Sequence, residues 1–433
     1  MGTSTFKSSG VQRDFFVEDL GATTARSATG LEASPADRWW SVSGVVSFLA
    51  AATTAFTVSL VGEMPIGEFI LIGAAGWALL CLVFNHAPPG RLFRSRYFWA
   101  LMIAQLIALV AYVASDLYRH SSMRDMARGW GRMVFLAIDV LALTYLFSCS
   151  RKNFLWFLIG QAAGALAYTA IHGPMFGDMW KFGVGAPITY AVFLLAPWGG
   201  ALIAALAAGG MGYAHLQLDY RSMGGICLVA AVLVFVSRMP VRFRWWIAPL
   251  ALAGAVAVVL HLYDEAKRGS RATRSDIERA AMLTAAKEAF EASPLIGHGS
   301  WFSNSDVYDN FMLIRHEAAK QARVGGFAGA NRAPGDEALH SQILVALAEG
   351  GLFGGAFFIV FGAGLLWALA HTVLFARWQR CAPITILILL LAVWNLLFSP
   401  FSGAHRVYIA MACGLILRLR TGGPRAVEAE ADA

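Results

Sequence analysis

The side chains best suited to chemistry lie late in the chain, in residues 336–354, where His340 is followed nine positions later by Glu349. A neutral imidazole can accept a proton from a hydroxyl group near physiological pH. The spacing of His340, Leu344 and Leu347 predicts a helix that runs from the acidic start of this stretch with the histidine on its inward face. Taken alone, a histidine in such a position is more often an ordinary packing residue.

Glycines lie at the end of this stretch and also ahead of it. Gly350, Gly351 and Gly354 permit another helix to approach closely. Earlier in the chain, the run Pro-Leu-Ile-Gly-His-Gly-Ser contains Gly297 and Gly299 and predicts a tight turn.

Basic residues gather ahead of that turn. Residues 267–279 contain five of them and only two acidic residues. The five are Lys267, Arg268, Arg271, Arg274 and Arg279. Such a cluster favours an anionic ligand, and a solvated loop with scattered ion pairs explains it equally well.

Arg279 also belongs to a predicted helix. Ser275 and Glu278 form a capping box, and the helix should end near Ala292, because Ser293 and a proline follow. Arg279 lies on the apolar side of this helix, so it either extends to the edge or directs its guanidinium towards an anion.

The composition indicates that a membrane protein positions these residues. Of 433 residues, 58% are hydrophobic and 14% are charged, with a mean hydropathy of +0.59, whereas soluble domains have about 25% charged residues. This excludes an ordinary soluble domain and a disordered chain. The excess of basic residues that gives the net charge of +7 therefore indicates which loops face the cytoplasm, and is weak evidence for nucleic-acid binding. The five cysteines form no CxxC pair and predict neither a disulfide framework nor a zinc site.

We expect an all-α polytopic membrane protein with about twelve transmembrane helices. The apolar run at residues 182–218 is too long for one crossing and predicts two helices broken near Pro197. The other runs are 41–61, 65–85, 97–115, 133–148, 154–171, 222–236, 245–263, 352–371, 384–397 and 407–417.

With twelve membrane-spanning helices both termini lie on one side, and the loops on that side are rich in arginine, which places both termini in the cytoplasm. The expected order is a disordered cytoplasmic tail, nine helices, a large external helical loop that carries the site, three helices and a second cytoplasmic tail. These parts are residues 1–38, 39–263, 264–342, 343–418 and 419–433. A shorter external loop, residues 116–128, holds Arg119, Arg124 and Arg128, which could extend an anion site or contact lipid headgroups.

Two acidic residues fall within predicted helices. Glu68 lies near the end of its apolar run, and we expect it at the membrane interface. Asp139 lies deeper, where an unpaired charge costs about 2.5 to 3.5 kcal/mol. We expect an arginine from the outer end to pair with it, with Arg132 two turns away on the same helix face as the candidate.

The run His-Ser-x-x-Leu-x-x-Leu-x-Glu-x-Gly, preceded by an arginine-bearing helix and Pro-x-x-Gly-x-Gly, resembles the signature of the bacterial O-antigen ligase and polymerase superfamily. The resemblance covers roughly residues 220–417, and the single large loop between late helices matches as well. It implies an inner-membrane glycosyltransferase of the C-type architecture. Such an enzyme is inverting and metal-independent, needs no cofactor, and moves a glycan from an undecaprenyl-diphosphate carrier to an acceptor hydroxyl at the periplasmic face.

The resemblance also implies roles for particular residues. His340 matches the essential loop histidine that activates the acceptor, and Arg279 and Arg221 match arginines that bind the diphosphate. Ser341 stands where the family more often has asparagine, and the segment around Arg221 lacks the usual Ser-Arg-Gly form. Ser341, Glu349, Arg274 and Arg124 are accessory candidates.

Three functions compete. A ligase would join the glycan to a lipid A core sugar, and a polymerase of the same superfamily would extend the glycan on its carrier. A secondary transporter for an anionic solute would also contain about twelve helices, but its two halves usually show broken helices at corresponding positions. The second half of this chain shows no break that matches the one near Pro197.

Overall fold

The computed structural model describes residues 41–421 except for 60–62, 85–91, 151, 174–177, 267–282, 303–312, 314–340 and 376–379. The expected all-α polytopic membrane architecture is confirmed. Helices α2 to α16 have the bounds α2 Val42–Ala52, α3 Ile66–Phe84, α4 Arg96–Arg119, α5 Met123–Cys149, α6 Lys152–His172, α7 Gly185–Leu195, α8 Ala201–Gln217, α9 Arg221–Arg238, α10 Val241–Ala266, α13 Gln342–Gly354, α14 Ala356–Ala370, α15 Ala382–Phe398 and α16 Gly403–Thr421.

Seven helical segments within the described ranges are long and apolar enough to cross a membrane. They are α3, α4, α5, α6, α9, the segment Trp180–Gly199 that includes α7, and the segment Ala356–Phe375 that includes α14. The apolar helices α2, α13 and α15 are shorter. Every apolar run expected to cross the membrane contains a described helix. By length and composition, however, seven segments among the described residues qualify as membrane-spanning, where the sequence predicts about twelve.

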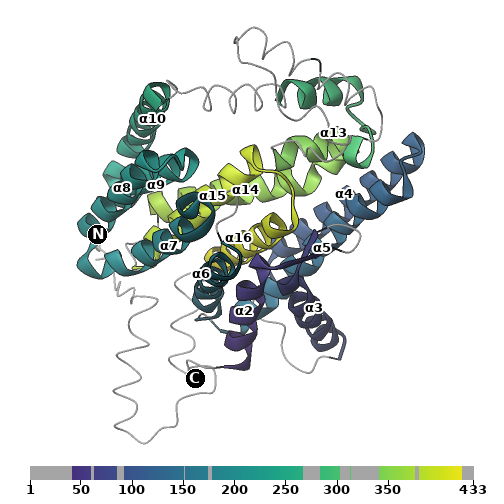
Figure 1. The fold of residues 1–433 in the computed structure, drawn as a ribbon, viewed down its shortest axis with the longest axis horizontal. Helices are drawn as coiled ribbons and strands as arrows, with labels where there is room; N and C mark the ends of the chain where they lie inside the picture. The colour runs from purple at the N-terminus through teal and green to yellow at the C-terminus, as the bar shows by residue number, and fades with distance from the viewer. Residues whose placement is uncertain are drawn as a thin grey trace, which may run out of the picture.

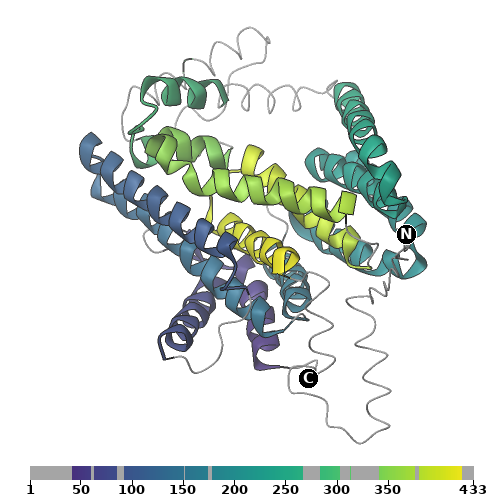
Figure 2. The ribbon, with the colours of Figure 1, turned by 180° about the vertical axis from the view of Figure 1, so that it is seen from behind.

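The helices form two groups joined by a shared core. α8, α9 and α10 lie together at one end of the molecule, whereas α4, α5 and α13 meet at the other (Figure 1). Between them, α14, α15 and α16 lie side by side, and the same arrangement is seen from behind (Figure 2). α16 packs along α5, and their close contact requires a glycine, because a Cβ at Gly414 would meet the ring of Phe147.

The first predicted transmembrane helix, residues 41–61, is wrong in its second half. α2 ends at Ala52, and β1 (Thr57–Ser59) then pairs antiparallel with β2 (Glu63–Pro65) in a hairpin with Thr57 opposite Pro65. The hydroxyl groups of Thr53 and Thr54 donate to backbone carbonyls of the last turn of α2. Such bonds compete with continued helix formation.

The loop expected at residues 116–128 is much shorter than predicted, because both neighbouring helices extend into it. α4 continues to Arg119 and ends at His120, which adopts the left-handed conformation with φ 53°. α5 begins directly after Ser122, whose hydroxyl accepts from the amide of Asp125. Charged residues here belong to helix ends that are held by caps.

The break predicted near Pro197 is confirmed. α7 gives way to a 3-10 turn at Ala196–Gly199, and Gly200 has φ +97° before α8 begins. A positive φ of this size favours glycine. The charge-free run therefore makes two helices.

Candidate functional site

A tight turn anchors the chain ahead of the α13 region. Gly297 and Gly299 have φ of +79° and +83°, as the sequence predicted for a turn at this point. The amide of His298 donates to the carbonyl of Ala348 at 2.9 Å, and the amide of Gly299 donates to the carbonyl of Glu349 at 3.0 Å. The turn, residues 294–301, is therefore hydrogen-bonded to the backbone of α13.

The turn packs against a kink in α13. Gly351 has φ +64° and ψ −162°, which are not helical values. The amide of Leu352 donates to the carbonyl of Pro294 at 2.7 Å. A Cβ at Gly351 would clash with the backbone of Leu295, and one at Gly297 would clash with the backbone of Glu349. Only glycine fits at these two contacts.

The carboxylate of Glu349 is the centre of the buried polar group that we call the Glu349 cluster. It accepts hydrogen bonds from Arg132 Nη2 at 2.6 Å, from the hydroxyl of Tyr112 at 2.9 Å and from the amide of Trp301 at 2.8 Å. Glu349 is 1% exposed. A carboxylate so far from water requires this charge pairing and hydrogen bonding. One side chain thus links α4, α5, α13 and the turn.

Asp116 holds the same turn from α4. Its carboxylate accepts from the amide of Ser300 at 2.6 Å, from the hydroxyl of Ser300 at 2.7 Å and from the indole of Trp130 at 2.7 Å. The guanidinium of Arg119, one turn later on α4, donates to the carbonyl of Gly297 at 3.0 Å and to the hydroxyl of Ser293 at 2.9 Å. The turn is therefore fixed by charged groups along its length.

Two arginines lie against the ring of Trp301. The guanidinium carbon of Arg128 is 4.2 Å from the ring centroid, and that of Arg132 is 4.8 Å away. Trp301 itself has φ +62°, a left-handed conformation that is uncommon for a bulky residue. The backbone bond to Glu349 and the two cation–π contacts hold the ring in this conformation.

His298 is held in one tautomer by the turn. Its Nε2 lies 2.7 Å from the carbonyl oxygen of Ala289, which can only accept, so Nε2 carries the proton. Burial lowers the pKa of this imidazole, and the nearby positive charge of Arg119 lowers it further. The neutral form is therefore favoured at neutral pH.

The two candidate residues on α13 lie at its first and middle turns. Ser341 is the N-cap of the helix, and its hydroxyl accepts from the amide of Leu344 at 3.3 Å. The expected helix from residue 336 is wrong in its start, since α13 begins at Gln342. Its buried positions include Val345 and Glu349, whereas Leu344 is only half-buried. The predicted inward stripe is therefore wrong at Leu344, and His340 lies outside the described residues.

Two further candidates, Arg221 and Arg124, lie within the described residues, and neither is brought into the Glu349 cluster. Arg221 is the first residue of α9, and its Nε donates to Asp219 at 3.1 Å in a half-exposed pair. Arg124 is exposed near the start of α5. His340, Arg279 and Arg274 lie outside the described residues. The predicted helix around Arg279 is described from residue 283 onwards and ends at Ala292, as expected.

Sequence reasoning missed the partners of Glu349. Arg132 is separated from it by 217 residues in the sequence, and Tyr112 by 237. The available signal was the presence of charged residues, Asp116 and Arg132, directly at the ends of long apolar runs. Among the described residues, no three His, Cys, Asp or Glu side chains are grouped so that they could hold a metal ion.

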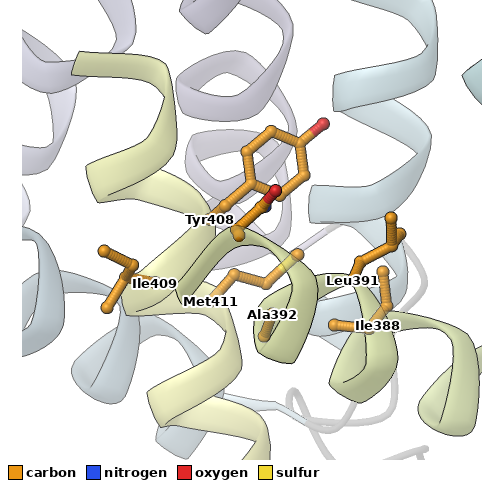
Figure 3. Close-up of a pocket in the computed structure, with 7 residues that line it drawn as sticks. Ile388, Leu391, Ala392, Tyr408, Ile409 and Met411 are labelled. Atoms are coloured by element: carbon orange, nitrogen blue, oxygen red, sulfur yellow. The ribbon is translucent and has the colours of Figure 1, made fainter. Parts of the chain in front are cut away.

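A separate small pocket lies between α15 and α16 (Figure 3). Its lining is apolar apart from Asn395 and Tyr408, and it contains no charged group. The other residues around it are Ile388, Leu391, Ala392, Ile409 and Met411. It has the character of a gap between packed helices and contributes no reactive group.

The fold and this site define a polytopic membrane protein in which buried charges attach a late loop segment to the helices. Residues 220–359, about a third of the chain, match the family model described as O-antigen ligase, and this match supports a relation of that region to the O-antigen ligase-related superfamily. The match supports a role in glycan transfer at a membrane. No curated protein matches the chain.

Proposed function

We propose that the protein is a membrane glycosyltransferase of the O-antigen ligase type. It would move a glycan from an undecaprenyl-diphosphate carrier to a hydroxyl of a lipid A core acceptor, at the periplasmic face of the bacterial inner membrane. The observation that carries the proposal is the family match over residues 220–359, since this range contains Arg221, Arg279 and His340. Both termini would lie in the cytoplasm, and membrane lipids would surround the helices.

The proposed reaction needs no cofactor or metal ion. The acceptor oxygen attacks the anomeric carbon, the bond from that carbon to the carrier diphosphate breaks, and the diphosphate leaves with the bonding electrons. His340 takes the proton of the acceptor hydroxyl as the new bond forms. Arg279 and Arg221 bind the diphosphate through charge-assisted hydrogen bonds, with Arg274 and Arg124 as accessory basic groups. Direct attack inverts the configuration of the anomeric carbon.

The described neighbours of His340 support this role. Ser341 follows it directly, is 2% exposed and is fixed as the N-cap of α13. α13 is in turn attached to α4, α5 and the turn through Glu349. A general base gains from such rigid support, because proton transfer requires a narrow geometry.

In-vitro transfer with the purified full-length chain tests the proposal. The assay contains a lipid-diphosphate-linked glycan, a core-type lipid acceptor and a chelator. We expect product with the wild type and a loss of at least about 100-fold with His340→Ala, the typical contribution of a general base. Arg279→Ala should lose product as well.

Two exposed residues provide matched controls. Lys287 lies on the described part of the loop helix that the sequence predicts to contain Arg279, and it forms a surface ion pair with Glu291 at 3.6 Å. His120 is an exposed histidine at the end of α4 with φ 53°, which asparagine also tolerates. Lys287→Ala and His120→Asn should retain wild-type transfer.

The products distinguish the alternatives. A glycan that only lengthens on its carrier would identify a polymerase with the same site. No product with any carrier-linked donor, together with uptake of an anionic solute that survives His340→Ala, would contradict glycan transfer and favour a transporter.

A further inference from the structure

Three helices from distant parts of the chain bring charged side chains together away from the Glu349 cluster. Arg406 of α16 donates from Nε to Glu68 of α3 at 3.0 Å and from Nη2 to the second carboxylate oxygen at 2.8 Å. Glu68 is 0% exposed and Arg406 is 5% exposed. Glu68, which we expected at the membrane interface, is therefore enclosed by the protein. It is the buried counter-ion of Arg406.

Asp139 of α5 completes this group, which we call the three-helix site. Its side chain is 0% exposed, and neither carboxylate oxygen has a hydrogen-bond donor among the described residues. The charged groups whose fields reach it from the neighbouring helices are Glu68 and Arg406. The Nε and Nη2 atoms of Arg406 both already donate to Glu68.

The expected pairing of Asp139 with Arg132 is wrong. The two residues are seven positions apart on α5, which is about 10 Å along a helix axis at 1.5 Å per residue. Neither carboxylate oxygen of Asp139 has a hydrogen-bond partner among the described residues, and the guanidinium of Arg132 is bonded to Glu349 at 2.6 Å.

The charges of the three-helix site do not balance if every group is ionised. Two carboxylates would face one guanidinium, which leaves a net charge of −1 in a region from which water is excluded. An uncompensated carboxylate in such surroundings is strongly disfavoured and takes up a cation instead. Ionised residues within transmembrane helices are functional candidates for this reason.

We propose that the three-helix site binds a proton and that Asp139 holds it in the folded protein. The protonated carboxyl is neutral, so the site then contains one ion pair and no net charge. Folding is coupled to uptake of this proton, because the carboxyl group of Asp139 is ionised in the unfolded chain at neutral pH. A sodium ion would satisfy the same charge count, and the experiment below separates the two.

The sign of the expected pH dependence follows from this difference. The folded chain keeps a proton that the unfolded chain loses above about pH 4. Raising the pH therefore favours unfolding, and one proton changes the unfolding equilibrium constant by up to tenfold for each pH unit. The contribution of the three-helix site to the free energy of unfolding is therefore fully present at low pH and is lost as the pH rises.

Equilibrium unfolding of the full-length chain in mixed micelles, between pH 5 and pH 8, measures this effect. Asp139→Asn imitates the neutral carboxyl and has no proton to lose. We expect the ratio of the wild-type to the variant unfolding constant to rise by up to tenfold per pH unit, so that the variant is the more stable protein at pH 8. Equal pH slopes, or a variant less stable than the wild type at pH 8, would overturn the proposal.

A second variant tests the charge count independently. In Glu68→Gln, Arg406 loses its counter-ion, and Asp139 can ionise to replace it. The pH slope assigned to Asp139 should then disappear, and Glu68→Gln combined with Asp139→Asn should be far less stable than either single variant. Additive effects of the two substitutions would contradict a shared charge balance.

Salt distinguishes a proton from a metal cation. We expect sodium chloride and choline chloride, at equal ionic strength, to have the same effect on the wild type at pH 8. A stabilisation specific to sodium that is absent in Asp139→Asn would show that the site binds sodium in place of a proton.

Discussion

Replacing Glu349 with glutamine preserves the shape of the side chain and removes its charge. The wild-type carboxylate accepts from Arg132, Tyr112 and the Trp301 amide, all at 2.6 to 2.9 Å. An amide has one acceptor oxygen, and its NH2 group would oppose at least one of these donors. Arg132, with a side chain that is 7% exposed, would remain buried without its counter-ion.

The expected loss is about 3–5 kcal/mol, the usual result of removing one partner of a buried ion pair. The free energy of unfolding of the full-length protein in mixed micelles measures it. Hydrogen exchange should also accelerate at the amides of His298 and Gly299, because both donate to the backbone around Glu349. Glycan transfer should fall together with this protection.

The double variant Arg132→Met with Glu349→Leu is the control for charge. It removes both ions and leaves no unpaired charge, and such replacements of whole pairs are often neutral. We therefore expect it to be more stable than Glu349→Gln. The reasoning is refuted if Glu349→Gln is as stable as the wild type, or if the double variant loses the sum of the two single effects.

Three further predictions concern the turn and the topology. Gly351→Ala should cost more than the about 1–3 kcal/mol of a residue held in a backbone conformation that is open almost only to glycine, because its Cβ also meets the backbone of Leu295. Gly210→Ala, with open space around it, should be neutral or slightly stabilising in unfolding experiments. Since burial lowers the pKa of His298, the turn should be fully stable above about pH 6.5 and should lose stability as the pH falls towards the lowered pKa. Hydrogen exchange at the amides of the turn measures this loss, and His298→Gln should remove the pH dependence. A reporter enzyme fused within residues 328–335 should be active only if that segment lies outside the cytoplasm, and activity of a cytoplasmic reporter there would contradict the topology.

Local patterns in the sequence predicted much of the fold. The charge-free run around Pro197 and Gly200 implied two helices, because both its length and its breakers are visible in consecutive residues. The turn at Gly297 and Gly299 was predicted for the same reason. The hairpin that follows α2 was not predicted, because its first strand continues the apolar run of the helix.

The pairing of buried charges could not be predicted in the same way. Glu68 and Arg406 are 338 residues apart, and hydropathy alone assigned Glu68 to the interface. For Asp139, proximity along one helix suggested Arg132, whereas the actual partner of Arg132 comes from α13. Which charges meet depends on how the helices pack, and single-sequence patterns carry little information about that packing.

The anchored turn has a consequence for the length of the chain that follows it. Trp301 and Ser341 are both held against the helices, so residues 303–340 leave from one fixed point and return to another. The entropy of closing a loop changes slowly with its size, by about 0.6 kcal/mol for each doubling. Insertions or deletions between these two anchored points should therefore cost little stability and should leave the contacts of the Glu349 cluster unchanged.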